Sequence, residues 1–348
     1  TPVTILKGQL SGMLEGVGVY QDRDKYLLRS LQVTGRMENL IGEMLAISRM
    51  EAGAAPLRRE RVELSALQYL SLVLPGMVIF TVGLILPMFL AMYYSLTSWN
   101  GMTVEKPFVG LSNYVRMFAD SYAGNAWLFT LKFTFWNTII ENVAAILLAV
   151  ALDSGIKGQK LLRTVFFVPC LISAVVVGFV WLKIYGNVLP ALFKSLGIDA
   201  NPMLFGKEST VLGGFLIANN WQWIGYWMLI YLAALQSIPG DLYEAAKVDG
   251  ASALRQFLRI TLPMLAPAMT ICIVGITTGS LKVYDLLVSS TNGGPGRAST
   301  SIIYYTYSTA INGRQYGYGS ALTISVVAAL LLVAFLQVKV LKKREVQM

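Results

Sequence analysis

The sequence predicts an all-α, polytopic membrane protein with about six transmembrane helices, preceded by a soluble helical hairpin. Of its 348 residues, 55% are hydrophobic and only 14% are charged, whereas about a quarter of a soluble domain is charged. The charges are also uneven: residues 1–65 hold nine basic and eight acidic residues, and the other 283 hold 19 and 11. Residues 1–65 are therefore predicted to be a soluble hairpin and linker, and residues 66–348 a membrane domain.

About six apolar segments are long enough to cross the ~30 Å hydrocarbon core of a bilayer. They cover residues 69–96, 131–152, 165–185, 212–235, 265–288 and 321–341. Each is expected to be helical, because only a helix satisfies its own backbone groups in lipid. Prolines within or beside these segments predict kinks, namely Pro75, Pro87, Pro169 and Pro267.

The basic residues predict the orientation, because Lys and Arg gather on the cytoplasmic side. They precede the first span, fill the connections after the second and fourth, and follow the last. They are Arg58, Arg59, Arg61, Lys157, Lys160, Arg163, Lys247, Arg255, Arg259, Lys339, Lys342, Lys343 and Arg344. Both termini of this multi-pass chain are therefore expected in the cytoplasm, with lipid around the spans.

The composition argues against several other classes of protein. With no histidine, the chain cannot use His-based acid–base catalysis or His metal ligands, and we predict neither catalytic nor metal-binding residues. Cys170 and Cys272 lie in apolar runs and are expected to be free. Nucleic-acid binding is not expected, because the basic residues flank apolar segments. No Gly-x4-Gly-Lys-Ser/Thr loop is present, so this chain should not hydrolyse ATP itself.

The connection between the fourth and fifth spans predicts a pair of short helices. Asp241 follows Pro239-Gly240 and is expected to be an N-cap, with Glu244 three residues later. Gly250 should end the first helix, a second should run over residues 252–260, and Pro263 should close it. Small side chains on the first helix would allow close approach by another protein.

The spacing in this connection resembles the coupling loop of permeases of ATP-binding-cassette (ABC) importers. The pattern E-A-A, three residues, G, nine residues, I-x-L-P is carried by Glu244, Ala245, Ala246, Gly250, Ile260, Leu262 and Pro263, with Asp249 inside it. The resemblance implies that these residues dock on an ATPase subunit, whose closure moves the membrane helices. An amphipathic loop on the membrane surface is the alternative.

Other segments, in order, resemble carbohydrate permeases of the maltose and glycerol-phosphate type. They are residues 74–76, 108–114, 136–138, 167–169 and 291–296. For residues 66–348 this implies a permease, not an enzyme, in a prokaryotic cell membrane. It also implies three kinds of partner: a second permease subunit as a heterodimer, two ABC ATPase subunits that bind ATP-Mg, and an extracytoplasmic sugar-binding protein. No cofactor is expected in this chain.

Polar residues within the apolar segments are candidates for a sugar path. Ionisable groups in lipid usually face the bundle interior, and amides, carboxylates and aromatic rings suit sugars. The candidates are Asn137, Glu141, Asn219, Asn220, Trp221, Gln222, Trp223, Tyr284 and Asp285. Interhelical hydrogen bonding or interfacial placement is the alternative. Lys282 and Asp285 are expected to pair one helical turn apart.

Residues 1–64 resemble a different family. The opening Thr1-Pro2 and the run 40–53 are similar to the dimerisation segment of sensor histidine kinases. That family's phospho-accepting histidine and ATP-binding domain are missing, which excludes autophosphorylation. An oligomerising hairpin, a fusion and an artefact all remain open.

Two other functions are alternatives to the importer. One is a membrane-anchored remnant of a two-component sensor kinase, which would need the missing histidine. The other is an ion-coupled secondary transporter, which predicts internal repeats, and none is visible. Among substrates, monosaccharides, oligosaccharides and glycerol phosphate stay open. Neutral oligosaccharides are favoured, because Lys282 is the only basic candidate in the path.

Overall fold

The computed structural model describes residues 66–198 and 202–341, and the chain divides into two compact units, Thr1–Gly76 and Met77–Met348. The predicted hairpin of residues 1–65 lies outside the described residues, so its kinase resemblance and the boundary near Ser65 stay predictions. The described residues contain no strand, only an isolated bridge between Thr97 and Phe108. The predicted all-α class is confirmed.

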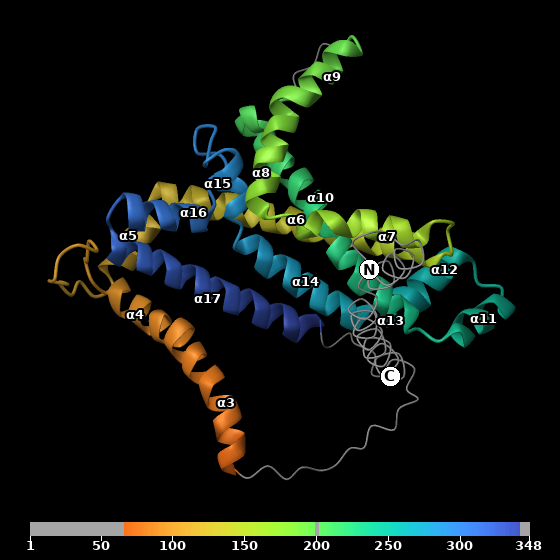
Figure 1. Cartoon of the computed structure of the whole chain (residues 1–348), viewed down its shortest axis with the longest axis horizontal. Coiled ribbons are helices and arrows are strands. Elements are labelled where there is room, and N and C mark those ends of the chain that lie inside the picture. The colour runs from red at the N-terminus through yellow and green to blue at the C-terminus, as the bar shows by residue number, and fades with distance from the viewer. Residues whose placement is uncertain (1–65, 199–201, 342–348) are drawn as a thin grey trace, which may run out of the picture. The chain divides into compact units, whose positions relative to one another are not determined.

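Helices make up most of this part of the chain (Figure 1), and the longest connections between them are residues 96–111 and 291–301. The α-helices are α3 (Ala66–Phe80), α4 (Leu86–Ser95), α5 (Ser112–Ala119), α6 (Ser121–Asp153), α7 (Gln159–Phe167), α8 (Ala174–Lys183), α9 (Leu189–Ser195), α10 (Glu208–Gln236), α11 (Gly240–Val248), α12 (Ala253–Gln256), α13 (Leu262–Met264), α14 (Ala266–Leu281), α15 (Asp285–Ser290), α16 (Ile302–Tyr307) and α17 (Tyr316–Leu341). Short π or 3-10 turns join several of them: η2 (Thr81–Ile85), η3 (Val168–Leu171), η4 (Ile184–Val188), η5 (Leu204–Gly206), η6 (Phe257–Thr261) and η7 (Ser308–Asn312).

Six helical segments correspond to the six predicted spans. By length and apolar composition, four described runs can cross a membrane: Leu70–Ser95, Ser121–Asp153, Ala174–Ser195 and Tyr316–Leu341. A fifth arises if Ala253–Met264 and Ala266–Leu281, bent by 69°, form one broken span. The sixth, α10, has 29 residues but is less apolar, because amides such as Asn219, Asn220 and Gln222 interrupt it.

Two predicted spans are misplaced. The second begins at Ser121 and not at residue 131, because Asp120 caps it by accepting hydrogen bonds from the Tyr122 and Ala123 amides. The third, predicted at 165–185, runs over Ala174–Ser195 instead. Its preceding chain is broken, since Pro169 lies in the 3-10 turn η3 and Ile172 is extended. Hydropathy reports apolarity, and it does not register such breaks.

Three π turns share one sequence feature, a following Leu-Pro pair. In each, the leucine amide donates to the carbonyl five residues earlier: Leu86 to Thr81, Leu189 to Ile184 and Leu262 to Phe257. The next residue is Pro87, Pro190 or Pro263. A proline has no N–H and its ring crowds the carbonyl four residues back, and the wider turn relieves that crowding.

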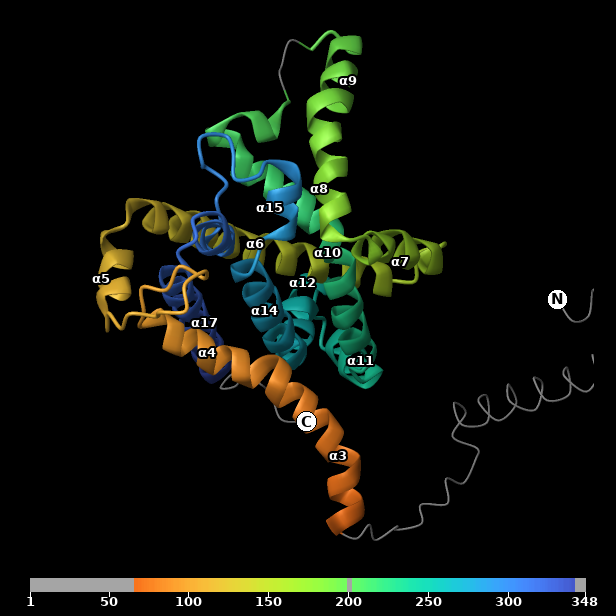
Figure 2. The same ribbon diagram turned by 60° about the vertical axis from the view of Figure 1, so that its left-hand side comes forward.

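α6 is the central helix of the second unit. It packs most extensively against α10 and then α14, and α14 in turn contacts α17; Figure 2 shows these helices from a second direction. Three apolar clusters hold them together, represented by Met228, Phe133 and Leu322. Cys272 is buried and Cys170 half-buried, and both are free thiols, as predicted.

Candidate functional site

The first candidate region is the helix pair that begins with α11. Its N-cap position is Pro239, with no side-chain hydrogen bond, and Asp241 lies in the first turn. The predicted N-cap role of Asp241 is therefore wrong. The helix starts directly after the proline, and a carboxylate within the first turn still complements the helix dipole.

Gly250 ends α11, as predicted. Its φ is +72°, a conformation that costs a residue with a Cβ about 1–2 kcal/mol. The Gly250 amide donates to the Lys247 carbonyl (3.0 Å) and the Ala251 amide to the Ala246 carbonyl (2.9 Å). These two bonds form a Schellman motif, which fixes the turn into the second helix.

The second helical segment is joined to both α11 and α14. Ser252 caps α12 by accepting from the Arg255 amide (3.4 Å). The Tyr243 and Thr261 hydroxyls are 2.9 Å apart and tie α11 to η6. Since η6 continues through Pro263 into α14, a force on α11 reaches α14 through covalent and hydrogen-bonded contacts.

The predicted docking residues are available at the surface. Glu244, Ala245, Asp249, Gly250 and Pro263 are exposed, and Ala246, Ile260 and Leu262 are half-buried. Val248 beside them is 88% exposed, which is unusual for a β-branched apolar side chain. α11 and α12 therefore present an exposed face, and they lie at one end of the helices (Figure 1).

The second candidate region is a polar junction between α6, α10 and α14. Asn137 Oδ1 accepts from Asn219 Nδ2 (3.1 Å) and Asn220 Nδ2 (2.9 Å). Its own Nδ2 donates to Glu141 Oε2 (2.7 Å) and Ser280 Oγ (2.9 Å). All four hydrogen-bonding positions of this amide are filled, so Asn137 fixes three helices and has no capacity left for a ligand.

A cavity of about 300 Å³ opens beside this junction. It brings together seven of the nine predicted path residues, Asn137, Glu141, Asn219, Gln222, Trp223, Tyr284 and Asp285. Glu141 is 1% exposed. Its Oε1 has no hydrogen-bond partner among the described residues, although the Trp227 indole approaches the same carboxyl group. A buried acceptor that lines a cavity is suited to a ligand donor.

The other two predicted residues do not line this cavity. Asn220 is buried behind Asn137, and Trp221 packs edge-on against Trp181 with ring centroids 5.9 Å apart. The predicted pair between Lys282 and Asp285 is also wrong, and no ion pair joins them. α14 ends at Leu281 and α15 begins at Asp285, so the two residues do not share a helical turn.

Sequence reasoning missed several residues of this region. Ser280, Gly275, Gly279 and Trp227 line the cavity, and a Cβ at Gly275 would collide with the Trp227 ring. Gln337 Nε2 donates to Thr277 Oγ1 (2.9 Å), which ties α17 to α14. The succession of small and hydroxyl residues along α14 was the available signal for close helix packing.

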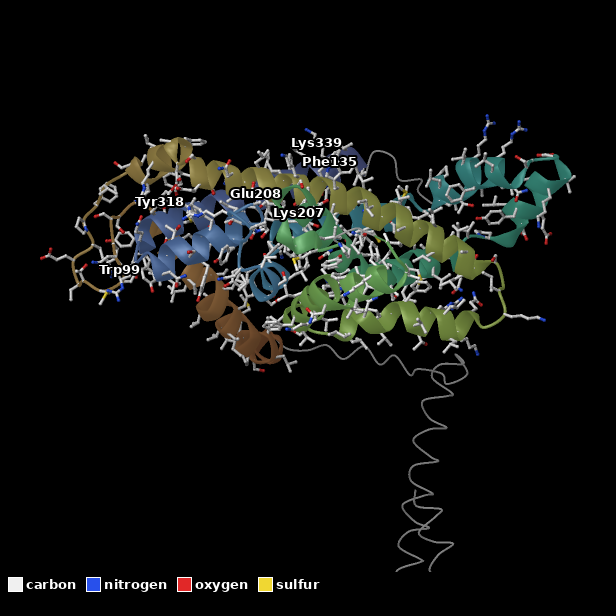
Figure 3. All side chains as sticks on the ribbon, turned by 90° about the horizontal axis from the view of Figure 1, so that it is seen from above. Trp99, Phe135, Lys207, Glu208, Tyr318 and Lys339 are labelled. Carbon is white, nitrogen blue, oxygen red and sulfur yellow. The ribbon has the colours of Figure 1, made fainter. Side chains whose placement is uncertain are left out.

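The opposite end of the helices carries a second polar centre, which the sequence did not suggest. Asp120 Oδ2 accepts from the hydroxyls of Tyr305 (2.6 Å) and Tyr318 (2.7 Å). Tyr318 and Trp99 lie at the end away from α11 and α12 (Figure 3). Burial raises the pKa of Asp120, but these hydroxyls and the Tyr122 and Ala123 amides outweigh it, so the pKa lies below its ordinary value. Burial and the same carboxylate raise the pKa of Tyr305 to about 12.

The chain is similar to known proteins in sequence and in fold. The profile of the family described as "Binding-protein-dependent transport system inner membrane component" matches residues 141–346. A probable starch degradation products transport system permease protein of Thermoanaerobacterium thermosulfurigenes is 32% identical over 280 residues, covering 80% of this chain and 96% of the relative. A multiple sugar-binding transport system permease protein of Streptococcus mutans is 33% identical over 262 residues, 75% of this chain and 90% of that protein.

A solved structure shares the fold. It belongs to a bacterial ABC transporter involved in the import of the acidic polysaccharide alginate, with a TM-score of 0.69 and 23% sequence identity. The match covers 78% of this chain and 94% of the other. None of these similarities supports the resemblance of residues 1–64 to a sensor kinase.

Proposed function

The chain belongs to the family of inner membrane components of binding-protein-dependent transport systems, and we propose that it forms half of the translocation path of an ABC importer for neutral oligosaccharides. As a member it is a membrane-embedded transport subunit and not an enzyme. This membership favours the importer over a kinase remnant or an ion-coupled transporter.

The observation that carries the coupling role is the uncovered α11 face. Glu244 and Ala245 are exposed in the middle of α11 and Gly250 just after it, and backbone hydrogen bonds fix the C-terminus of this helix. The Tyr243–Thr261 contact and the continuous chain through Pro263 connect this face to α14. A partner that binds α11 and moves it would therefore also move α14, which lines the cavity.

The cavity supports passage of a hydroxyl-rich, uncharged ligand. Glu141 Oε1 and Gln222 Oε1 are buried acceptors without partners among the described residues. Acceptors of this kind favour sugar hydroxyls and disfavour an anion. Trp223 and Tyr284 line the same cavity and supply aromatic surface for sugar rings. Lys282 is the only basic residue of the lining.

The remaining parts of the proposal follow from this role. Both termini lie in the cytoplasm, where α11 meets one of two ABC ATPase subunits that bind ATP-Mg. A second permease subunit completes the path, and an extracytoplasmic binding protein delivers the sugar. The solved relative with a bound periplasmic protein, an alginate transporter, has the same fold at a TM-score of 0.67, which supports such an assembly.

Cysteine cross-linking tests the coupling role. Ala245→Cys, in the assembled transporter with Cys170 and Cys272 replaced by serine, should cross-link to the ATPase and react with thiol reagents only from the cytoplasmic side. Thr103→Cys, exposed in the loop after α4, is the matched control and should react only from outside. Ala245→Cys labelled from outside, or never linked to an ATPase, contradicts the proposal.

A further inference from the structure

A second, larger cavity lies near the end of the helices that carries Asp120. Its volume is about 910 Å³, within the usual range for small-ligand sites. It is lined by the first part of α6, the start of α10, the loop after α15 and the segment that begins with α16. We call it the outer groove and define it by Asn125, Lys132, Glu208, Arg297, Tyr304 and Ser308.

Hydrogen bonds and ring contacts hold the walls of the outer groove in place. The Tyr304 hydroxyl donates to Asn292 Oδ1 (3.1 Å), and the Thr291 and Ser299 hydroxyls are 2.8 Å apart. The Arg297 guanidinium lies 4.1 Å from the centre of the Tyr122 ring. The groove therefore has a defined shape before any ligand enters, which reduces the ordering cost of binding.

Four polar side chains of the groove are unused. Asn125, Lys132, Glu208 and Ser308 line it, and none has a side-chain hydrogen bond or ion pair to another described residue. Together they offer hydrogen-bond donors and acceptors beside tyrosine rings, with a positive charge on Lys132 and a negative charge on Glu208. Lys132 and Arg297 share this lining with Glu208, and this mixture of donors and acceptors suits a neutral polyhydroxylated ligand.

The outer groove and the cavity at Glu141 lie in series along the same helices. On α6, Asn125 precedes Asn137 by 12 residues, or about 18 Å of helix. One apolar cluster separates them, since its members Phe129 and Val211 line the outer groove and Val283 and Leu286 line the inner cavity. Because the side chains of this cluster are packed together, a ligand can contact both cavities only when the helices part, and it must then be extended along them.

We propose that the outer groove is a carbohydrate-binding site that engages the trailing units of an oligosaccharide and makes transport depend on chain length. The proposal rests on the proposed function, both for the sugar and for the orientation. A disaccharide would use the inner cavity alone, whereas a tetrasaccharide would also contact Asn125 and its neighbours.

Uptake by cells that carry the complete transporter tests this. The probes are radiolabelled disaccharides and tetrasaccharides of the malto-, xylo- and arabino- series, and each variant is compared with the wild type for each sugar. Asn125→Ala should lower tetrasaccharide uptake about fivefold, as expected for one lost ligand hydrogen bond, and leave disaccharide uptake unchanged. Asn125→Trp, which fills the groove, should lower tetrasaccharide uptake further. Ser121→Ala, exposed on the same helix outside the groove, should change neither.

Three other results would overturn the proposal. If Asn125→Trp takes up both disaccharides and tetrasaccharides as fast as the wild type does, the groove is not used. Equal loss of both lengths, with weaker association of the binding protein, shows that the groove docks that protein instead. A wild-type transporter that imports no sugar of any series contradicts the proposed function as well, which distinguishes the two failures.

Discussion

Asn220 Nδ2 donates a 2.9 Å hydrogen bond to Asn137 Oδ1 and so joins α10 to α6 beside the inner cavity. Both side chains are buried. Because Asn219 donates to the same oxygen, the α10 residues predicted to line a sugar path also form the joint that positions the path. The two roles coincide in Asn219, which also lines the cavity, whereas Asn220 belongs to the joint alone.

Asn137→Ala should destabilise the protein. It removes an amide that makes four hydrogen bonds, and it leaves buried donors and acceptors on three helices unpaired. At about 1 kcal/mol for each net hydrogen bond lost, the free energy of unfolding should fall by roughly 2–4 kcal/mol. The loss of stability is measured by heating the purified transporter and detecting the folded fraction by size-exclusion chromatography. Asn125→Ala, exposed on the same helix, is the control, and an equal loss in both variants would contradict the assignment.

Glu141→Gln should lower transport and preserve the fold. The glutamine can still accept from Asn137 Nδ2 through its remaining oxygen, but an NH2 donor replaces the acceptor at Oε1. One ligand hydrogen bond contributes about 1 kcal/mol, so uptake should fall about fivefold. Radiolabelled sugar uptake, normalised to the amount of folded transporter, measures the effect. Unchanged uptake would remove Glu141 from the path.

Gly250→Ala should weaken coupling between ATP hydrolysis and transport. Its φ of +72° strains a residue with a Cβ, so the Schellman turn should open and α11 should shift relative to η6. Substrate-stimulated ATP hydrolysis by the assembled transporter should drop several-fold, with the fold intact. The control is Gly240→Ala, because a Cβ there meets no atom within 4 Å and its φ is not in the left-handed region. Loss of stimulation in both variants would point to a general defect.

Asp120→Asn should reduce stability at neutral pH. The pKa of Asp120 is lowered in the folded protein, so its stabilising contribution is complete above the unfolded value near 4. It is lost as the pH falls through the folded value. The difference in unfolding temperature between wild type and variant should stay constant from about pH 8 to 5 and shrink below about pH 4. A difference that vanishes already at pH 6 would contradict this.

The turn between α11 and α12 was predictable because its sequence signals are local. Gly250 favours a turn whatever the rest of the fold does, and the structure has it. The second helix, predicted from residue 252, begins at Ala253 because Ser252 is its N-cap. Asp241 failed because two acceptable helix starts, Pro239 and Asp241, are two residues apart, and nothing in the sequence ranks them.

The inner cavity was predictable for another reason. Amides and carboxyls in apolar segments must avoid lipid, which led to five of its lining residues, and the suitability of aromatic rings for sugars led to Trp223 and Tyr284. Ser280 escaped notice because its hydroxyl is already satisfied by the Ile276 carbonyl of its own helix (2.8 Å), as serines in helices commonly are. The outer groove could not be foreseen, because its walls come from α6, α10 and the loop after α15, whose proximity is a property of the tertiary fold.

The π turns before Pro87, Pro190 and Pro263 have a consequence for reading this chain. A turn of this kind holds one residue more than an α-turn, so every later side chain is rotated by about 100° around the axis. Helical-wheel comparisons that run through 81–85, 184–188 or 257–261 will therefore assign the wrong face downstream. Deleting one residue from such a segment should restore an α-helical phase and rotate the downstream side chains by about 100° relative to those before it.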